Sequence, residues 1–379
     1  MDPHLLCHLL KNNVGQDAEP LIAQIGKQLL GNDEETAGKT LNEAKEKAAA
    51  LLTILGKNKE KEQLRKEMKF TLEELTQSEY KITIEDCYAL FDYAKLLYEV
   101  KDYKNAEKYL FNLKEILANE SASHSALITK VFWGLLATQI INQKTREAIE
   151  LTSLRKLKEM IKNKQPENTV HLLNQYQWIM HWILVASFTA QKSTGLFAAL
   201  LADRQNFGDP FVNVMKLTNQ NLMRYMVASF LLGRSEYQPQ PDNQRTQQIA
   251  KLPRNALPQL ALPIILAERD SYQDSFTLFT EALFEEFDFE KAIELAEELT
   301  KEAENDVFLK PHAAELRRQA LLYVFETETK LYKTGIDLTT FCDQHKISEV
   351  DVACREVQAS LASEELRVHL SDGDMIGSQ

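Results

Sequence analysis

Residues 98–110 read YEVKDYKNAEKYL, and residues 284–299 read FEEFDFEKAIELAEEL, which is a loose copy of the first stretch. A fainter copy, INQKTREAIELTSL, spans residues 141–154. In each stretch a short polar turn opens a helix with one small residue at a fixed place, namely Ala106, Ala292 and Ala148. Alanine there lets two antiparallel helices approach closely, so the three stretches predict helical hairpins that stack on one another.

Helical spacing dominates the chain around these stretches, and strand-like alternation is almost absent before its last residues. Three apolar stripes recur at steps of three and four residues: Leu90, Phe91, Ala94, Leu97 and Tyr98; Tyr103, Ala106, Leu110, Leu113 and Leu117; and Ile128, Val131, Phe132, Leu135 and Leu136. Each stripe must be buried against a neighbouring helix. Because the copies are irregularly spaced, we expect a right-handed, tetratricopeptide-like helical stack rather than a uniform repeat array.

The composition is that of a folded chain, with 379 residues, 44% of them hydrophobic and 26% charged. This length allows two or three packed units. The net charge of −12 disfavours binding to nucleic acid or to anionic lipid. The four cysteines form no CxxC pair, and the N-terminus lacks the features of a signal peptide, so we expect a cytoplasmic protein. The apolar run 178–188 is too short for a membrane span and predicts a buried helix.

Two segments interrupt the helical pattern. Residues 57–69 carry six basic and three acidic residues and predict a solvated helix face or a linker. Residues 234–263 contain five prolines and many amides, which predict a surface loop. We therefore divide the chain into an N-terminal helical region with a charged linker, a helical-repeat stack, a proline-rich loop with further helices, and a C-terminal unit, with the bounds 1–79, 80–232, 233–313 and 314–379.

The C-terminal unit has a different pattern. A long helix is predicted over residues 314–332, after which Ile336 leads into a short helix and a further helix runs to about residue 362. Leu366, Val368 and Leu370 then alternate with polar residues as in a strand, and Met375–Ile376 can return as a second strand. Three helices followed by a β-hairpin are the pattern of a winged helix.

No catalytic, cofactor-binding or metal-binding motif stands out in the sequence. His4, Cys7 and His8 have helical spacing but lack a fourth ligand, so ordinary helix packing is the better interpretation. His181 lies in an apolar helix, and we expect a buried histidine bonded to a neighbouring backbone group or carboxylate rather than a catalytic base. We therefore predict a protein that is not an enzyme and that needs no cofactor.

Two charged surfaces bear on partners. Arg155, Lys158 and Lys162 share one helical face, which suits either plain solvation or contact with RNA or an acidic partner. Residues 337–379 hold nine acidic and three basic residues, a net charge of −6 that opposes DNA binding. We expect the C-terminal hairpin to pack on protein through its edge, with Leu366, Val368, Leu370, Met375 and Ile376 as the partner-binding residues.

A helical stack followed by an acidic winged helix resembles a PCI domain, the family found in the proteasome lid, the signalosome and eukaryotic translation initiation factor three. The segments YAKLLYEVKDYKNAEKYLFNL (93–113), WIMHW (178–182), RDSYQDSFTLFTEALFEEFDFEKA (269–292) and LLYVFETETKLYKTGIDLTTFCD (321–343) are similar, in order, to the family of the e subunit of that initiation factor. Family members continue past the winged helix into a further helix, whereas this sequence ends at Gln379.

The resemblance implies a non-catalytic scaffold that docks on other PCI subunits through its winged helix and helps assemble the initiation complex on the small ribosomal subunit. It implies no membrane or DNA partner and only weak or indirect RNA contact. A PCI scaffold subunit of the proteasome lid or of the signalosome is the alternative, because it shares the architecture and differs in partners. The aromatic segments favour the initiation factor.

Overall fold

The computed structural model of the chain is helical in the part that it describes, apart from two strands of two residues each. It describes residues 2–13, 18–30, 34–120, 124–142, 169–189, 194–202, 209–233, 256–331, 336–337 and 375–376, with Leu157, Glu159 and Ile161 between them. The all-helical class expected from the sequence is confirmed over these residues. By its internal contacts the chain divides into two compact units, residues 1–191 and residues 192–379.

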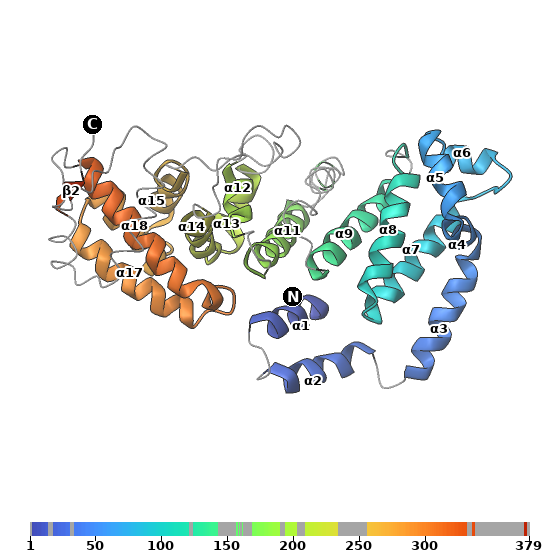
Figure 1. Ribbon diagram of the computed structural model, residues 1–379, viewed down its shortest axis with the longest axis horizontal. Coiled ribbons are helices and arrows are strands. Elements are labelled where there is room, and N and C mark those ends of the chain that lie inside the picture. The colour runs from blue at the N-terminus through green and yellow to red at the C-terminus, as the bar shows by residue number, and fades with distance from the viewer. Residues whose placement is uncertain are drawn as a thin grey trace. The chain divides into compact units, whose positions relative to one another are not determined.

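The first unit is a succession of helices in which α7, α8 and α9 lie side by side (Figure 1). The three apolar stripes predicted from the sequence fall on these three helices, and their leucines are buried. The described helices of this unit are α1 (Pro3–Asn13), α2 (Glu19–Leu30), α3 (Glu34–Lys47), α4 (Ala49–Gly56), α5 (Asn58–Lys66), α6 (Leu72–Gln77), α7 (Ile84–Glu99), α8 (Tyr103–Ile116), α9 (Ser125–Ile141) and α11 (Thr169–Thr189).

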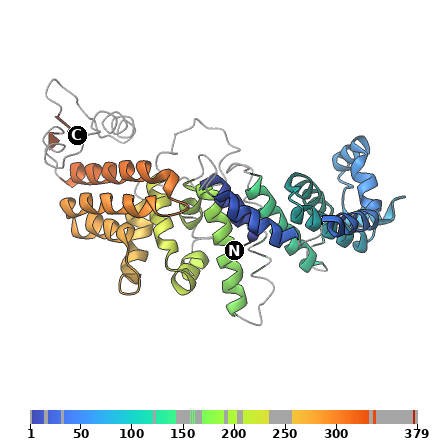
Figure 2. The same cartoon turned by 90° about the horizontal axis from the view of Figure 1, so that it is seen from below.

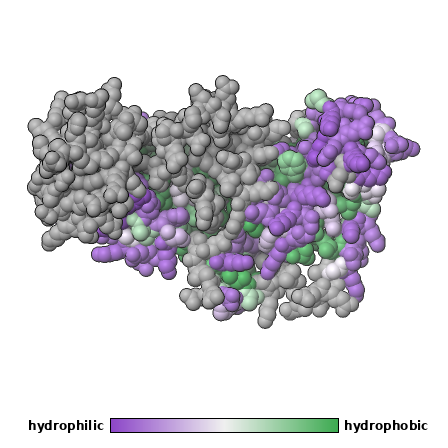
Figure 3. Space-filling view, viewed as in Figure 1, coloured by the Kyte–Doolittle hydropathy of each residue, from purple (hydrophilic) through white to green (hydrophobic). Residues whose placement is uncertain are grey.

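Two segments of the first unit, residues 178–188 and 57–69, agree with the sequence-based expectations. The second also makes specific contacts with α8. The apolar run 178–188 lies in α11 and is largely buried, as predicted. The charged run 57–69 contains α5, whose polar residues contribute to the hydrophilic surface over α5 to α8 in Figure 3. Its Arg65 nevertheless forms an ion pair with Glu115 of α8, donates to the Asn112 side chain at 3.0 Å, and lies over the Phe70 ring at 5.3 Å. The run is therefore docked on α8 at this residue.

The second unit is built around α14, nearly all of whose side chains are buried. This helix packs against α12, α16 and α18. Helix α17 in turn packs against both α16 and α18. The described elements are α12 (Leu196–Ala202), α13 (Asp209–Thr218), α14 (Leu222–Gly233), η3 (Leu257–Ala261), α15 (Leu262–Glu268), α16 (Ser275–Glu281), η4 (Ala282–Glu286), α17 (Phe289–Glu304), η5 (Lys310–His312), α18 (Ala313–Leu331), β1 (Ile336–Asp337) and β2 (Met375–Ile376).

The α7–α8 and α16–α17 hairpins share one turn. In each hairpin, the residue just before the N-cap of the second helix has a left-handed backbone. This residue is Lys101, with φ of 69°, in the first hairpin and Phe287, with φ of 55°, in the second. The next residue is an aspartate whose carboxylate caps the following helix, so that Asp102 accepts from the Asn105 N–H and Asp288 from the Lys291 N–H. Four residues beyond each aspartate stand Ala106 and Ala292, both fully buried, as predicted from the repeated sequence.

The expectation of a surface loop over residues 234–263 is wrong for its last part. Residues 257–263 belong to η3 and the start of α15, and residues 234–255 lie outside the described residues. Pro258 and Pro263 stand in the first turn of η3 and of α15 respectively. Proline is tolerated there because a first-turn N–H has no partner within its own helix.

The end of the second unit is described in three pieces. The long helix predicted over residues 314–332 is present as α18. Ile336–Asp337 then form β1 rather than the approach to a short helix, and β1 pairs antiparallel with β2, with Ile336 opposite Ile376 and Asp337 opposite Met375. Among the described residues no helix is both long and apolar enough to cross a membrane.

Candidate functional site

The residues singled out in the sequence are only partly described. Met375 and Ile376 form β2, whereas Leu366, Val368 and Leu370 lie outside the described residues, and so do Arg155, Lys158 and Lys162. Between these last three, Leu157 and Ile161 are helical and buried while Glu159 is helical and exposed. These three residues have the alternation of buried and exposed positions expected within one turn of an amphipathic helix.

A cluster of polar side chains fixes α1 against the hairpin of α7 and α8. The Asp2 carboxylate accepts from the backbone N–H of His4 at 2.9 Å and of Leu5 at 3.1 Å, and so caps the start of α1. It also accepts from the Tyr98 hydroxyl at 3.2 Å, while His4 Nδ1 and the Tyr103 hydroxyl share a hydrogen bond of 2.9 Å. We call Asp2, His4, Tyr98 and Tyr103 the α1 cluster. Seen from below, α1 lies across α11 (Figure 2).

Burial sets the protonation state of the α1 cluster. It lowers the pKa of His4, so the imidazole is neutral at physiological pH. It also raises the pKa of Tyr98, with a smaller contribution from the Asp2 charge, and raises that of Tyr103 to about 12. Both phenols therefore stay protonated and act as hydrogen-bond donors or acceptors. The hydrogen bonds of the cluster therefore join α1 to α7 and α8.

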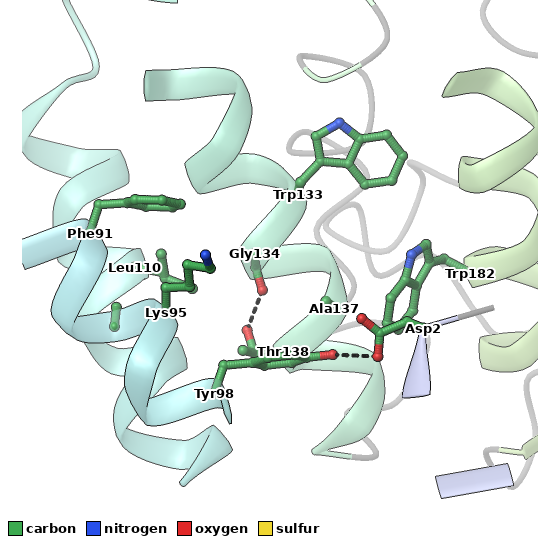
Figure 4. A pocket seen from close by; sticks show the side chains of 11 residues that line it. Asp2, Phe91, Lys95, Tyr98, Leu110, Trp133, Gly134, Ala137, Thr138 and Trp182 are labelled. Atoms are coloured by element: carbon green, nitrogen blue, oxygen red, sulfur yellow. Dashed lines mark hydrogen bonds between the residues drawn. The ribbon is translucent and has the colours of Figure 1, made fainter. Parts of the chain in front are cut away.

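Beside this cluster lies a pocket of about 240 Å³ between α7, α9 and α11. Figure 4 shows Phe91, Lys95 and Tyr98 of α7 on one side of it and Trp133 of α9 and Trp182 of α11 on the other. Its walls are mostly apolar, and Lys95 forms an ion pair with Glu99 at 3.8 Å. An apolar pocket with aromatic walls suits an inserted apolar side chain rather than a reaction.

The floor of this pocket depends on Gly134 in α9. A Cβ atom built at this position would stand 2.9 Å from Leu110 Cδ1 of α8, closer than two carbons approach each other. The absence of a side chain therefore lets α8 and α9 pack tightly. The pocket was missed in the sequence, although a glycine inside a helical apolar stripe is a recognised signal of close helix approach.

His181, Cys7 and Cys87 also fit structural roles. His181 Nδ1 is 2.7 Å from the carbonyl oxygen of Gln177, which confirms the expected bond to backbone, although the ring is only half-buried. Burial raises the pKa of the Cys87 thiol to about 12 and raises that of Cys7, so neither is a thiolate at neutral pH. Within the described ranges, no three acidic, histidine or cysteine side chains are placed to hold a metal ion.

In the second unit a partly buried ionic network joins α14 to α16 and α17. The Arg224 guanidinium of α14 donates to Asp274 at 3.0 Å and to Glu302 at 2.6 Å, and lies 3.8 Å from Asp306. The hydroxyls of Tyr225 and Tyr272 donate to Asp306 at 2.8 Å and to Asp274 at 2.7 Å. Burial alone would lower the pKa of Arg224, but the bond to Asp274 and the neighbouring charges outweigh it and raise the pKa. The network holds the helices together.

Comparison with known proteins gives these observations a context. No family model matches the chain. It is 26% identical over 304 residues to the E subunit of eukaryotic translation initiation factor 3 of Arabidopsis thaliana, a match that covers 77% of this chain and 62% of the relative. It is 25% identical over 278 residues to the E-1 subunit of this factor in Drosophila willistoni and 24% identical over 289 residues to the E subunit in Caenorhabditis elegans, each over 57% of the relative.

The expected resemblance to the E subunit of this initiation factor is thereby confirmed, since the matches cover about three quarters of the chain. The chain spans about three fifths of the length of the curated relatives that it matches.

Proposed function

We propose that this chain is a non-catalytic scaffold subunit of eukaryotic translation initiation factor 3 that works in the cytoplasm. The observation that carries the proposal is the similarity to the E subunit over about three quarters of the chain. The described side chains are consistent with it, because their partly buried polar clusters join helices, and the pocket beside α1 suits an inserted side chain. A scaffold acts by position, holding its partners in place.

The architecture that we propose is a tetratricopeptide-like stack that ends in a winged helix of the PCI type. Two features support it. The α7–α8 and α16–α17 hairpins repeat the same turn and the same buried alanine, as stacked helical hairpins do. After α18, the pairing of β1 with β2 brings residues 336 and 376 together, which is the closure that a short sheet following three helices requires.

Partners follow from charge. The net charge of −6 over residues 337–379 opposes binding to a nucleic-acid backbone and favours protein surfaces. We propose that the hairpin of Leu366, Val368, Leu370, Met375 and Ile376 docks edge to edge on the winged helix of another PCI subunit. The scaffold then helps assemble the initiation complex on the small ribosomal subunit. Arg155, Lys158 and Lys162 would supply no more than weak RNA contact.

Affinity purification of the tagged chain from cell lysate, followed by mass spectrometry, tests this function. We expect other subunits of the initiation factor together with small-ribosomal proteins. Recovery with proteasome-lid or signalosome subunits would move the protein to the alternative that shares its architecture. The relatives described above, all subunits of the initiation factor, favour the first outcome. A chain recovered alone would contradict both.

The docking edge is tested by Val368→Asp. A charge placed on an apolar docking strand should lower the amount of the chain recovered with the complex by about 10-fold. His369→Asp is the matched control, because strand alternation places it on the opposite side from Val368. Equal recovery of the two variants would contradict the proposed edge.

A further inference from the structure

The segment FEEFDF at residues 284–289 contains three phenylalanines with different surroundings. The ring of Phe284 packs edge-on against Tyr323 of α18, with 6.2 Å between ring centroids. Phe289, the first residue of α17, is partly buried. Phe287 lies between them at the tip of the α16–α17 hairpin and is 48% exposed. The fold therefore packs two of these rings and leaves about half of Phe287 exposed to solvent.

Phe287 also has an unfavourable backbone conformation. Its φ of 55° and ψ of 32° are left-handed, a conformation that glycine adopts freely and that a bulky side chain disfavours. The corresponding turn residue of the α7–α8 hairpin is Lys101, so the turn itself does not require an aromatic ring. The four described positive-φ residues other than glycine are Met68, Lys81, Lys101 and Phe287. The turn requires a left-handed residue whichever side chain it carries, so the feature that distinguishes Phe287 from Lys101 is its half-exposed aromatic ring.

Negative charge surrounds this ring. Glu285, Glu286, Asp288 and Glu290 are all exposed. Two cations lie nearby. Lys291 forms an ion pair of 2.7 Å with Glu286, and the charge of Arg269 stabilises the ionised form of the neighbouring Glu281. We call Glu285, Glu286, Phe287, Asp288 and Glu290 the acidic tip. Such a surface repels phosphate backbones and anionic lipid.

We propose that the acidic tip is a docking surface, and that its partner is a protein with an apolar socket bordered by arginine or lysine. An exposed aromatic ring that enters a socket is the kind of residue that supplies most of the binding energy at protein interfaces. The carboxylates around it steer association toward a basic rim and fix the orientation. Because four carboxylates stand beside the ring and, among the described residues, only Glu286 is paired with Lys291, an acidic surface would be repelled and an uncharged surface would gain nothing from them.

This surface deepens the proposed function by locating one place where the scaffold holds a partner, and its test separates the two ideas. The photoreactive amino acid p-benzoylphenylalanine, a larger aromatic residue that keeps a ring at the turn, replaces Phe287 in the full chain, which is expressed in cells and irradiated. The same residue at position 68 is the control, since Met68 is also exposed, apolar and left-handed but lies among charges of both signs. Cross-linked peptides are identified by mass spectrometry.

We expect position 287, and not position 68, to cross-link to one defined protein segment in which lysines or arginines flank an apolar residue. Cross-links to nucleic acid, to this chain itself or to an acidic segment, or yields no higher than at position 68, would overturn the proposal. If the tagged chain still recovers the initiation factor, the proposed function stands without this surface. A basic partner outside that factor would keep the surface and remove the proposed function.

A second pair of variants separates recognition from folding. Phe287→Gly and Met68→Gly each relieve the left-handed strain, and each should raise the midpoint of thermal unfolding of the purified chain by about 2–4 °C. Only Phe287→Gly should lower recovery of the cross-linked partner, by about 10-fold. A fall in the unfolding midpoint of Phe287→Gly would show that the ring holds the turn, and unchanged recovery would show that it binds nothing; either result overturns the proposal.

Discussion

Replacing Arg224 with methionine is expected to destabilise the second unit strongly. The guanidinium reaches Asp274, Glu302 and Asp306, whose side chains are 4%, 34% and 9% exposed. Methionine fills a similar volume along the stem of the side chain and removes the charge. Asp274 and Asp306 would keep tyrosine hydroxyls and backbone N–H groups as hydrogen-bond donors, but no positive charge would stand between them. An uncompensated pair of buried carboxylates is the source of the loss.

The magnitude follows from the degree of burial. Removing one partner of a fully buried ion pair costs about 3–5 kcal/mol. Arg224 is itself 23% exposed and Glu302 is 34% exposed, so water screens part of the network and the expected loss is about 2–4 kcal/mol. Neutralising the partner as well should restore some of it. In the double variant with Asp274→Asn, we expect a coupling energy of at least about 1 kcal/mol.

Native-state hydrogen exchange read by mass spectrometry is the assay, because it resolves the free energy of opening helix by helix. Peptides from α14, α16 and α17 should lose protection in the variant, and peptides from α7 and α8 should not. Lys291→Met is the control: it breaks an ion pair of 2.7 Å that is 44% and 46% exposed, which should change stability by at most about 0.5 kcal/mol. Equal effects of the two variants, or no coupling with Asp274→Asn, would refute the reasoning.

Two further predictions concern the first unit and the shared turn. Asp102→Ala and Asp288→Ala each remove a helix cap of the same geometry, so each should lower the free energy of unfolding by about 1 kcal/mol in urea denaturation, and a loss confined to one of them would show that the turns are not equivalent. Burial lowers the pKa of His4, so the unfolded chain binds a proton more readily; the stability from neutral His4 is present above about pH 6.5 and is lost as the pH falls below it. Hydrogen exchange of α1 should therefore show weaker protection at pH 5.5 than at pH 7.5 after correction for intrinsic rates, and His4→Gln should reduce that difference unless His8 dominates it.

Much of the helical framework could be predicted because its signals are local. The stripes on α7, α8 and α9 depend on spacing within one helix, and the buried Ala106 and Ala292 follow from a turn that recurs in the sequence. The aspartate caps within these turns are equally local, but their geometry became visible only in the structure. Periodicity and capping are set by neighbours in sequence, which is why they survive in a chain with no regular repeat.

The sequence-based errors had two causes: the position of a proline within its helix, and the pairing of strands that are far apart in sequence. Pro258 and Pro263 fall in the expected loop because proline breaks helix interiors, whereas both stand in first turns, where no N–H is needed. Ile336 is expected before a helix, yet it pairs with Ile376, forty residues farther along the chain. No local pattern at residue 336 reports a partner at that distance.

The sites were harder to predict than the fold. Arg224 stands in the run LMRYMVASF and reads as an interruption of an apolar helix, because its partners Asp274, Glu302 and Asp306 come from two later segments. The pocket beside α1 likewise takes its two tryptophans from α9 and α11. Only the helical Gly134 gives a local signal of it. The exposure of Phe287 also required the structure, since FEEFDF gives no indication of which ring is buried.

The distribution of charge constrains how the proposed scaffold would act on the small ribosomal subunit. Inside the second unit, the single positive charge of Arg224 faces three carboxylates, so the network offsets only part of their charge, and the whole chain carries a net charge of −12. A surface of that sign is repelled by ribosomal RNA and attracted to basic protein. If the chain works on the small ribosomal subunit, it should reach it through proteins. An exposed phenylalanine among four carboxylates is then suited to the basic surfaces that such proteins offer, and this is why the α16–α17 turn rather than the equivalent turn at Lys101 is the place to look for a partner.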